Sequence, residues 1–292
     1  MQYNFNVMRL KNKIQIDIDD WVQPESNLLQ FYKMNGKSYV TYMTQIKNLG
    51  EGVHGLVRGD YVLISKVACD IATSPTSPYK FEGKRYYNIP CSQIIGKFKR
   101  NVLKLSNLEL FKGYIIYKKV EREGNSFLNI PDVNATIGVI LKVSNESSLK
   151  EGEVVMLRDN VSTPMRLESS EYFAAEERAI VGVFKDSESL SFSNLDIMNK
   201  NILMKPYISK NLLNSSILET PSITYEDLDY SDVFNRDLFK VCYIDKSLED
   251  IKENEILILN RDYTNYVYFN NEKYFIIDGK KWISGKIIER DN

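Results

Sequence analysis

The residue types that most often carry chemistry are scarce in this chain. It has one histidine, His54, and three widely separated cysteines, Cys69, Cys91 and Cys242. A zinc site or a histidine base needs partner side chains at suitable spacing, and His54 has none in its neighbourhood. An odd number of distant cysteines favours small apolar side chains in a reducing compartment over a disulfide framework. We therefore expect no catalytic residues, no metal site and a non-enzymatic protein.

Residues 50–55 (GEGVHG) have the glycine spacing of a dinucleotide-binding loop. Such a loop binds a pyrophosphate when it connects a strand to the N-terminus of a helix, where backbone N–H groups meet the phosphates. Here residues 56–65 follow with the pattern of a strand, and no strand–helix–strand unit surrounds the motif. We interpret it as a glycine-rich β turn and expect no cofactor.

The composition is that of a folded protein without a strong charge. Of the 292 residues, 43% are hydrophobic and 26% charged, and the formal net charge is −1. This balance predicts no nucleic-acid partner and no anionic membrane surface, and the basic residues 97–100 are interpreted as a solvated linker. No apolar run reaches the length of a membrane span, and the first residues lack the apolar core of a signal peptide. We expect a cytoplasmic protein.

Alternation of polar and apolar residues dominates the chain, and helical spacing is rare. Short runs rich in β-branched and aromatic residues predict strands. They are residues 13–18, 38–46, 61–65, 113–120, 137–143, 154–157, 239–244 and 256–259. The expected fold class is all-β, built from several small sandwiches or barrels.

A three-fold internal repeat organises these strands. Each copy has an acidic turn leading into an apolar strand, then a Tyr-bearing strand, then a final apolar strand interrupted by glycine. The acidic residues are Asp60, Glu153 and Glu255; the Tyr-bearing segments are 82–87, 170–173 and 272–276; the glycines are Gly96, Gly182 and Gly285. A glycine within a strand marks a bulge or a barrel corner. We predict three tandem domains, at residues 1–98, 99–187 and 188–292, a normal size for small domains.

The second copy resembles the GroES co-chaperonin family. The resemblance rests on the strand 114–120, the loop 121–136 containing residues 127–132 (FLNIPD), the strand 138–141 and the turn and strand 150–155 (KEGEVV). The C-terminal halves of the other two copies share its later elements. The resemblance implies three tandem small GroES-like β-barrels.

In that family the loop docks as an extended apolar anchor into a groove of the chaperonin's apical domain. The corresponding residues here are Phe127, Leu128, Ile130, Pro131, Ile217 and Leu218, with residues 27–29 (NLL) as the first repeat's candidate. Exposed apolar loop residues indicate a partner that covers them. The alternative, that residues 127–131 pack on a neighbouring barrel of the same chain, stays open.

Two functions follow as hypotheses. The first is a co-chaperonin-like cap or adaptor that binds a GroEL-type chaperonin, which itself hydrolyses ATP. The second is a structural protein of a bacteriophage particle, such as a capsid-associated protein, a portal or tail adaptor or a ring component, located in the virion. Family members carry one or two such domains and form sevenfold rings, and three domains do not divide into seven. An oligomeric assembly is expected in both cases.

Overall fold

The computed structural model describes most of the chain. The described residues are 11–17, 43–68, 79–81, 83–120, 136–158, 162–168, 170–187, 190–207, 238–259, 266–269 and 272–287. Their regular structure is almost entirely β, and helix is limited to three-residue 3-10 turns and one helical turn at residues 66–68. The all-β prediction is therefore confirmed.

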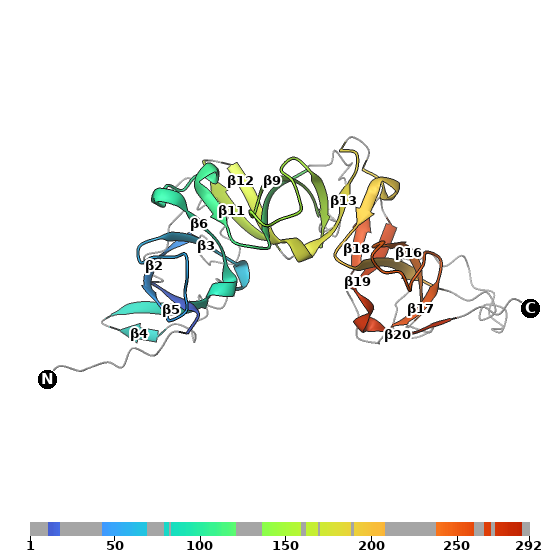
Figure 1. The fold of residues 1–292 in the computed structure, drawn as a ribbon, viewed down its shortest axis with the longest axis horizontal. Helices are drawn as coiled ribbons and strands as arrows, with labels where there is room; N and C mark the ends of the chain where they lie inside the picture. The colour runs from blue at the N-terminus through green and yellow to red at the C-terminus, as the bar shows by residue number, and fades with distance from the viewer. Residues whose placement is uncertain are drawn as a thin grey trace, which may run out of the picture. The chain divides into compact units, whose positions relative to one another are not determined.

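The strands form three antiparallel sheets that follow one another along the chain (Figure 1). The first sheet has the order β4-β5-β1-β2-β3-β6-β7, the second β11-β12-β8-β9-β10-β13-β14, and the third β18-β19-β15-β16-β17-β20. Among the described strands, the third sheet thus repeats the order of the other two without their last strand. The three-fold repeat read from the sequence recurs as a three-fold repeat of strand order.

The strand bounds are as follows. In the first sheet they are β1 (Lys13–Asp17), β2 (Met43–Leu49), β3 (Tyr61–Ile64), β4 (Tyr79–Phe81), β5 (Lys84–Pro90), β6 (Ile94–Phe98) and β7 (Leu108–Leu110). In the second they are β8 (Tyr114–Lys119), β9 (Thr136–Val143), β10 (Val154–Leu157), β11 (Thr163–Leu167), β12 (Ser170–Glu176), β13 (Ile180–Phe184) and β14 (Leu195–Ile197). In the third they are β15 (Asn201–Pro206), β16 (Leu238–Ile244), β17 (Ile256–Leu259), β18 (Tyr266–Phe269), β19 (Glu272–Asp278) and β20 (Ile283–Ile287).

The chain also divides into two compact units. One contains residues 1–121, 138–153 and 160–179, and the other residues 122–137, 154–159 and 180–292. The division separates β10, β13 and β14 from the other strands of the second sheet. The two units do not coincide with the three sheets, and the predicted domain boundaries stay a prediction.

The acidic turn of each repeat has one structure. Asp60 accepts a hydrogen bond from Val57 N at 2.9 Å, Glu153 from Lys150 N at 2.9 Å, and Glu255 from Lys252 N at 3.1 Å. Each carboxylate therefore closes its own turn by binding the backbone N–H three residues earlier, as turn-forming acidic residues do.

The residue before each of these carboxylates has a left-handed backbone. Its φ is 93° at Gly59, 90° at Gly152 and 69° at Asn254, a region that glycine and asparagine tolerate. Its N–H donates to the second strand of its repeat, at Ile46 O in the first and Val241 O in the third. The turn therefore fixes where the apolar strand starts.

A β-bulge precedes the glycine of each closing strand. In the second repeat Met156 pairs with Gly182 but the next residue, Leu157, pairs with Ile180, so one residue of β13 is extra. The same register shift occurs at Gly96 and at Gly285. A register shift of this kind is one of the two features, a bulge or a barrel corner, that the glycines indicated.

Candidate assembly junctions and partner-binding loops

The strand that completes each of the first two sheets comes from the start of the next repeat. β7 pairs antiparallel with β6, placing Leu110 opposite Gly96, and β14 pairs with β13, placing Ile197 opposite Gly182. β7 then leads directly into β8 of the second sheet, and β14 into β15 of the third. We call these two places junctions, because the second and third repeats each donate a strand to the sheet before them.

The close approach of the donated strand explains why glycine occupies positions 96 and 182. A Cβ on Gly96 would lie 2.5 Å from Glu109 O in β7, and a Cβ on Gly182 would lie 2.6 Å from Asp196 O in β14. Carbon and backbone oxygen do not approach so closely without displacement of the strand. Glycine at these positions therefore permits the junction.

The first residue after each junction also binds the preceding repeat. Tyr114 Oη donates to Ser92 O at 3.1 Å, and burial, with the nearby Glu176 carboxylate, raises the pKa of Tyr114 to about 12. At the matching position Asn201 is fully buried, and its Nδ2 donates to Met198 O at 2.7 Å and Ile180 O at 3.1 Å. Ser92 lies in the 3-10 turn that precedes β6, and Ile180 directly follows the 3-10 turn that precedes β13.

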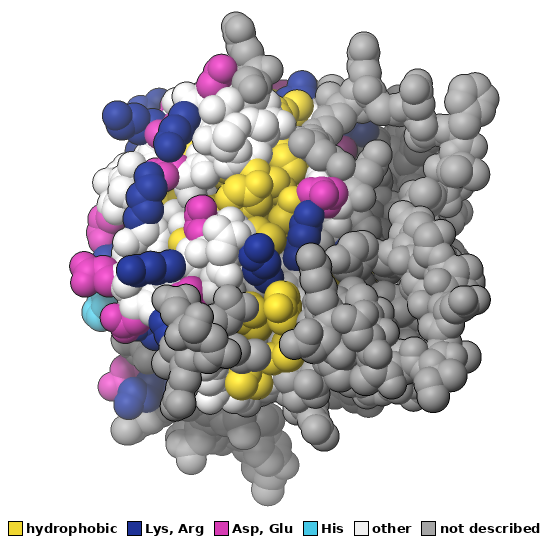
Figure 2. Space-filling model, turned by 90° about the vertical axis from the view of Figure 1, so that its right-hand side faces the viewer, with side chains coloured by type: hydrophobic (Ala, Val, Ile, Leu, Met, Phe, Trp, Pro, Cys, Tyr) yellow, Lys and Arg dark blue, Asp and Glu magenta, His cyan; other side chains and the backbone are white. Residues whose placement is uncertain are grey.

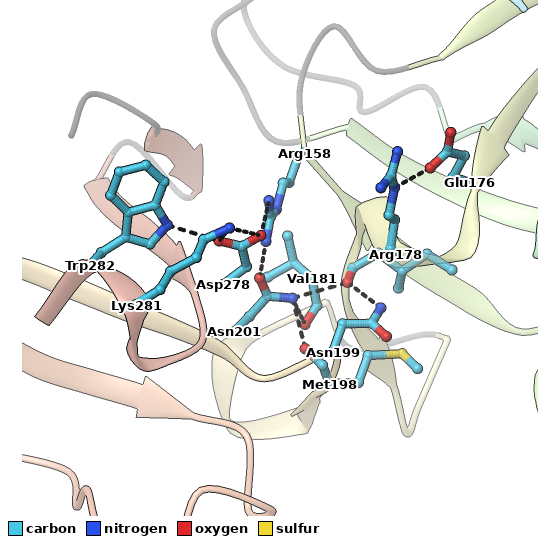
Figure 3. Close-up of polar contacts among 11 residues, drawn as sticks. Arg158, Glu176, Arg178, Val181, Met198, Asn199, Asn201, Asp278, Lys281 and Trp282 are labelled. Atoms are coloured by element: carbon cyan, nitrogen blue, oxygen red, sulfur yellow. Dashed lines mark hydrogen bonds and ion pairs between the residues drawn. The ribbon is translucent and has the colours of Figure 1, made fainter. Parts of the chain in front are cut away.

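At the second junction Asn201 belongs to a polar network (Figure 3). Arg158, directly after β10, donates through Nη2 to Asn201 Oδ1, and its Nη1 lies 3.8 Å from Asp278 Oδ2 at the end of β19. Asp278 Oδ1 also accepts a hydrogen bond from Trp282 Nε1 at 3.0 Å. The network joins strands of the second and third sheets within one compact unit.

The electrostatics of this network are those of a structural ion pair. Burial opposes ionisation of Asp278, but the hydrogen bond from Trp282 and the cations Lys281 and Arg158 outweigh it and lower the pKa of the carboxyl. All its charged groups have opposite charges as neighbours. This arrangement fixes a junction and contains no nucleophile with an adjacent base.

Apolar side chains from both sides of each junction share a core. In the first junction one buried cluster combines residues of both sheets: Met43, Leu63, Ile95, Phe98, Leu108, Leu110, Tyr114, Ile116, Met165, Leu167 and Ala174. In the second, the Phe192 ring centroid lies 4.4 Å from that of Phe269 and 4.6 Å from that of Tyr274. These buried apolar and aromatic contacts stabilise each junction.

The longest connections occur at the same topological position in every repeat. They link the first strand to the second, between β1 and β2 (residues 18–42), β8 and β9 (120–135), and β15 and β16 (207–237). All six proposed anchors, Phe127, Leu128, Ile130, Pro131, Ile217 and Leu218, belong to the last two connections. They lie outside the described residues.

The strands beside two of these connections are held in place at their ends. Next to residues 120–135, Lys119 Nζ lies 4.4 Å above the Phe173 ring centroid. Next to residues 207–237, Lys205 Nζ lies 2.8 Å from Glu272 Oε1, and this contact lowers the pKa of the Glu272 carboxyl. Each connection thus starts from a strand whose end is fixed to the neighbouring Tyr-bearing strand.

The described surface shows mixed charges. On the face in Figure 2, Lys and Arg side chains alternate with Asp and Glu, and apolar side chains are visible between them. Among the described residues no His, Cys, Asp and Glu side chains gather in a group that could hold a metal. Within those same residues, no helix has the length and apolar character needed to cross a membrane.

The junction strands are the feature that the sequence reading missed. The signal was a second recurrence, Asn107-Leu108-Glu109-Leu110-Phe111 and Asn194-Leu195-Asp196-Ile197-Met198, directly before the first strands of the second and third repeats. Comparison with other proteins adds no family: no protein-family model and no curated protein matches the chain.

Proposed function

We propose that the chain is a non-enzymatic, co-chaperonin-like protein made of three GroES-like β-barrels, which binds a GroEL-type chaperonin through apolar loop anchors. The observation that supports this is the common position of the three long connections, each between the first and second strands of its repeat. The resemblance to the GroES family places a chaperonin-binding loop at this same position. Each connection also contains an apolar candidate anchor, at residues 27–29, 127–131 and 217–218.

The test is a double substitution, Leu128→Ser with Ile130→Ser. Two aliphatic anchors buried by a partner contribute about 1.5–3 kcal/mol each. Their loss should weaken binding to a GroEL-type chaperonin, measured with ATP present, by at least about a hundredfold. The melting temperature of the isolated chain should stay the same, because exposed loop residues contribute little to stability.

A matched control is Val57→Ser. Val57 is 62% exposed and lies outside the three connections, so its loss should leave chaperonin binding unchanged. If the wild-type chain fails to bind the chaperonin, and the double substitution lowers the melting temperature, residues 127–131 pack within the chain and the proposal is wrong.

A structural role in a bacteriophage particle is the second candidate. It is favoured by the third sheet, in which β20 stands last in the order of the strands that the structure describes. Such a position suits a component that continues into neighbouring subunits. Recovery of the chain in purified particles, with no binding to the chaperonin, would support this role over the first.

A further inference from the structure

The first and third repeats contain an ion pair at the same place with opposite polarity. In the first repeat Asp17 Oδ2, in β1, lies 3.5 Å from Lys84 Nζ, in β5. In the third repeat Lys205 Nζ, in β15, lies 2.8 Å from Glu272 Oε1, in β19. The first strand of the repeat therefore supplies the anion in one case and the cation in the other. Each ion pair lies within a single compact unit.

The charged residues of the first strands occupy equivalent positions. A register shift against the second strand of the repeat falls directly before Ile16 in β1 and directly before Met204 in β15. Asp17 and Lys205 are the residues that follow. Counted from the same irregularity in the strand, the two charges therefore have the same position.

Their partners on the Tyr-bearing strands are equivalent as well. Lys84 is the first residue of β5, and Glu272 is the first residue of β19. Across the hairpin each pairs with a phenylalanine, Lys84 with Phe81 and Glu272 with Phe269. The ion pair thus connects the same two strand positions in both repeats, and only its polarity differs.

The apolar contacts between the same strands are alike in these two repeats. Ile14 of β1 pairs with Ile89 of β5, and Ile202 of β15 pairs with Ile277 of β19. All four side chains are fully buried. If β1 and β15 exchanged partners, this contact between two isoleucines would be kept, so it cannot distinguish the right pairing from the wrong one.

The second repeat differs in both respects. Its corresponding apolar contact joins Ile115 to a smaller residue, Ala175. Its Tyr-bearing strand, β12, begins with Ser170, which carries no charge and cannot form an ion pair. The ion pair is therefore found in the two repeats whose core contacts could be exchanged.

The strand faces that carry Asp17 and Lys205 are where the two repeats differ. On these faces Gln15 pairs with Asn88, whereas Leu203 pairs with Ile276. An exchange would place a polar side chain against an aliphatic one. This mismatch adds to the effect of the charges in the same direction.

An exchange of strands would bring like charges together. β1 against β19 places Asp17 beside Glu272, and β15 against β5 places Lys205 beside Lys84. Like charges at neighbouring cross-strand positions are destabilising. The Asp17 side chain is only 1% exposed, so solvent and salt screen its charge poorly.

We propose that the opposite polarity of these two ion pairs prevents β1 and β15 from exchanging partners between the first and third repeats, within one chain or between copies. Exchange of elements between similar units is a characteristic error in the folding of repeat proteins. Specificity against it comes from repulsion in the wrong pairing together with attraction in the right one. The inference does not depend on the proposed chaperonin partner, and its test contains only this chain.

The experiment is refolding of the full chain from urea, with the native fraction measured by circular dichroism and size-exclusion chromatography. The double substitution Lys205→Glu with Glu272→Lys keeps an ion pair in the third repeat but gives it the polarity of the first. Both wrong contacts then change from repulsion to attraction. The ratio of mispaired to native chains should rise by at least about fourfold over the wild type.

A neutral variant separates polarity from the loss of an ion pair. Lys205→Gln with Glu272→Gln removes the attraction in the native pairing and the repulsion in the wrong one. Its mispaired fraction should lie between those of the wild type and the inverted variant. The matched control is Lys112→Glu with Glu146→Lys, which inverts an exposed ion pair of 2.7 Å at another place and should refold as the wild type does.

Cross-linking identifies the wrong pairing directly. A carbodiimide joins a carboxylate to a neighbouring amine through an amide bond. In mispaired chains of the inverted variant, mass spectrometry after proteolysis should find Asp17 joined to the amine introduced by Glu272→Lys. In native chains of the same variant, the cross-link should join positions 205 and 272.

Two results would overturn the proposal. One is an inverted variant that refolds with the native fraction of the wild type and without the cross-link from Asp17 to position 272. The other is a neutral variant that mispairs more than the inverted one, because the loss of attraction would then be the cause. If the inverted chain does not refold, a neutral variant with the native fraction of the wild type overturns the proposal as well.

Discussion

At the scale of single residues, the repeat is defined by carboxylates that close turns. Asp60, Glu153 and Glu255 all bind a backbone N–H three residues earlier, although the turns around them differ in sequence. Glu255 also lies 2.7 Å from Lys286 Nζ in β20. Its charge therefore links the turn to the closing strand of the third repeat.

This arrangement predicts a pH dependence. The hydrogen bond from Lys286 is the main cause that lowers the pKa of Glu255 from 4.5, against the effect of burial. A lowered folded-state pKa gives stability that is present above pH 4.5 and is lost as the pH falls through the folded value. Glu255→Gln should lower stability at pH 7 by about 0.2–1 kcal/mol, the range for exposed pairs.

The measurement is urea unfolding of the wild type and the variant at pH 7 and at pH 3.5. The difference between them should shrink at the lower pH, because the unfolded wild-type chain then binds a proton at Glu255 and part of the stabilisation by the lowered pKa is lost. Glu253→Gln, which changes an exposed neighbouring carboxylate, is the control and should leave the pH dependence unaltered. A difference of equal size at both pH values would contradict the argument.

At the scale of elements, the closing strands show how a glycine can be required by a strand far along the sequence. Gly182 and Gly285 each follow a register shift. Gly182 pairs with β10, and Gly285 pairs with the corresponding strand of the third sheet, β17. They differ in the other neighbour, since β14 covers Gly182 and no described strand covers Gly285.

Alanine at these two glycines should therefore have different effects. Gly182→Ala forces a Cβ against Asp196 O and should destabilise the chain by about 1–3 kcal/mol, as overpacking does. Gly285→Ala should change the stability of the chain by less than about 0.5 kcal/mol, the range of neutral surface changes. Thermal melting of the two variants beside the wild type makes the comparison, and equal losses in both variants would refute it.

Much of this element structure could be predicted from the sequence. The strands predicted at residues 61–65, 154–157 and 256–259 are confirmed within a residue, because alternation and β-branched content are local signals. The strand predicted at 38–46 is found as β2 from Met43, and residues 38–42 lie outside the described residues.

What the sequence did not reveal depends on contacts between distant residues. β7 and β14 are only three residues long, too short for a periodic signal. Asn201 and Tyr114 share a role without sharing a side-chain chemistry, so no motif connects them. Arg158, Asn201 and Asp278 come from three separate strands or their ends, and their network exists only once those strands are placed.

At the scale of the whole molecule, the junctions decide where one repeat ends. The predicted boundary at residues 98 and 99 falls between β6 and β7, two strands of the same sheet. A fragment that ends at Phe98 therefore lacks the strand that covers β6, and a fragment that ends at Phe111 contains it.

Fragments 1–98 and 1–111 should consequently differ in stability. β7 contributes Leu108 and Leu110 to a buried cluster, and even one such side chain contributes about 1.5–3 kcal/mol when it is fully buried. Chemical denaturation should give a clearly higher midpoint for the longer fragment. A third fragment, 1–111 with Gly96→Ala, should lose much of that gain, and equal midpoints for 1–98 and 1–111 would show that β7 adds nothing to the sheet.

Strand donation also determines when each sheet can be completed during synthesis. A repeat made on the ribosome cannot complete its sheet when its own closing strand emerges, because the seventh strand belongs to residues that are translated later. The first sheet stays incomplete until Leu110 has been synthesised, and the second until Ile197 has been synthesised. The interval between a closing strand and its donated strand is about one second at 5–20 residues per second. During that interval each closing strand is a temporary open edge, and the first partner to reach it is the next stretch of the same nascent chain.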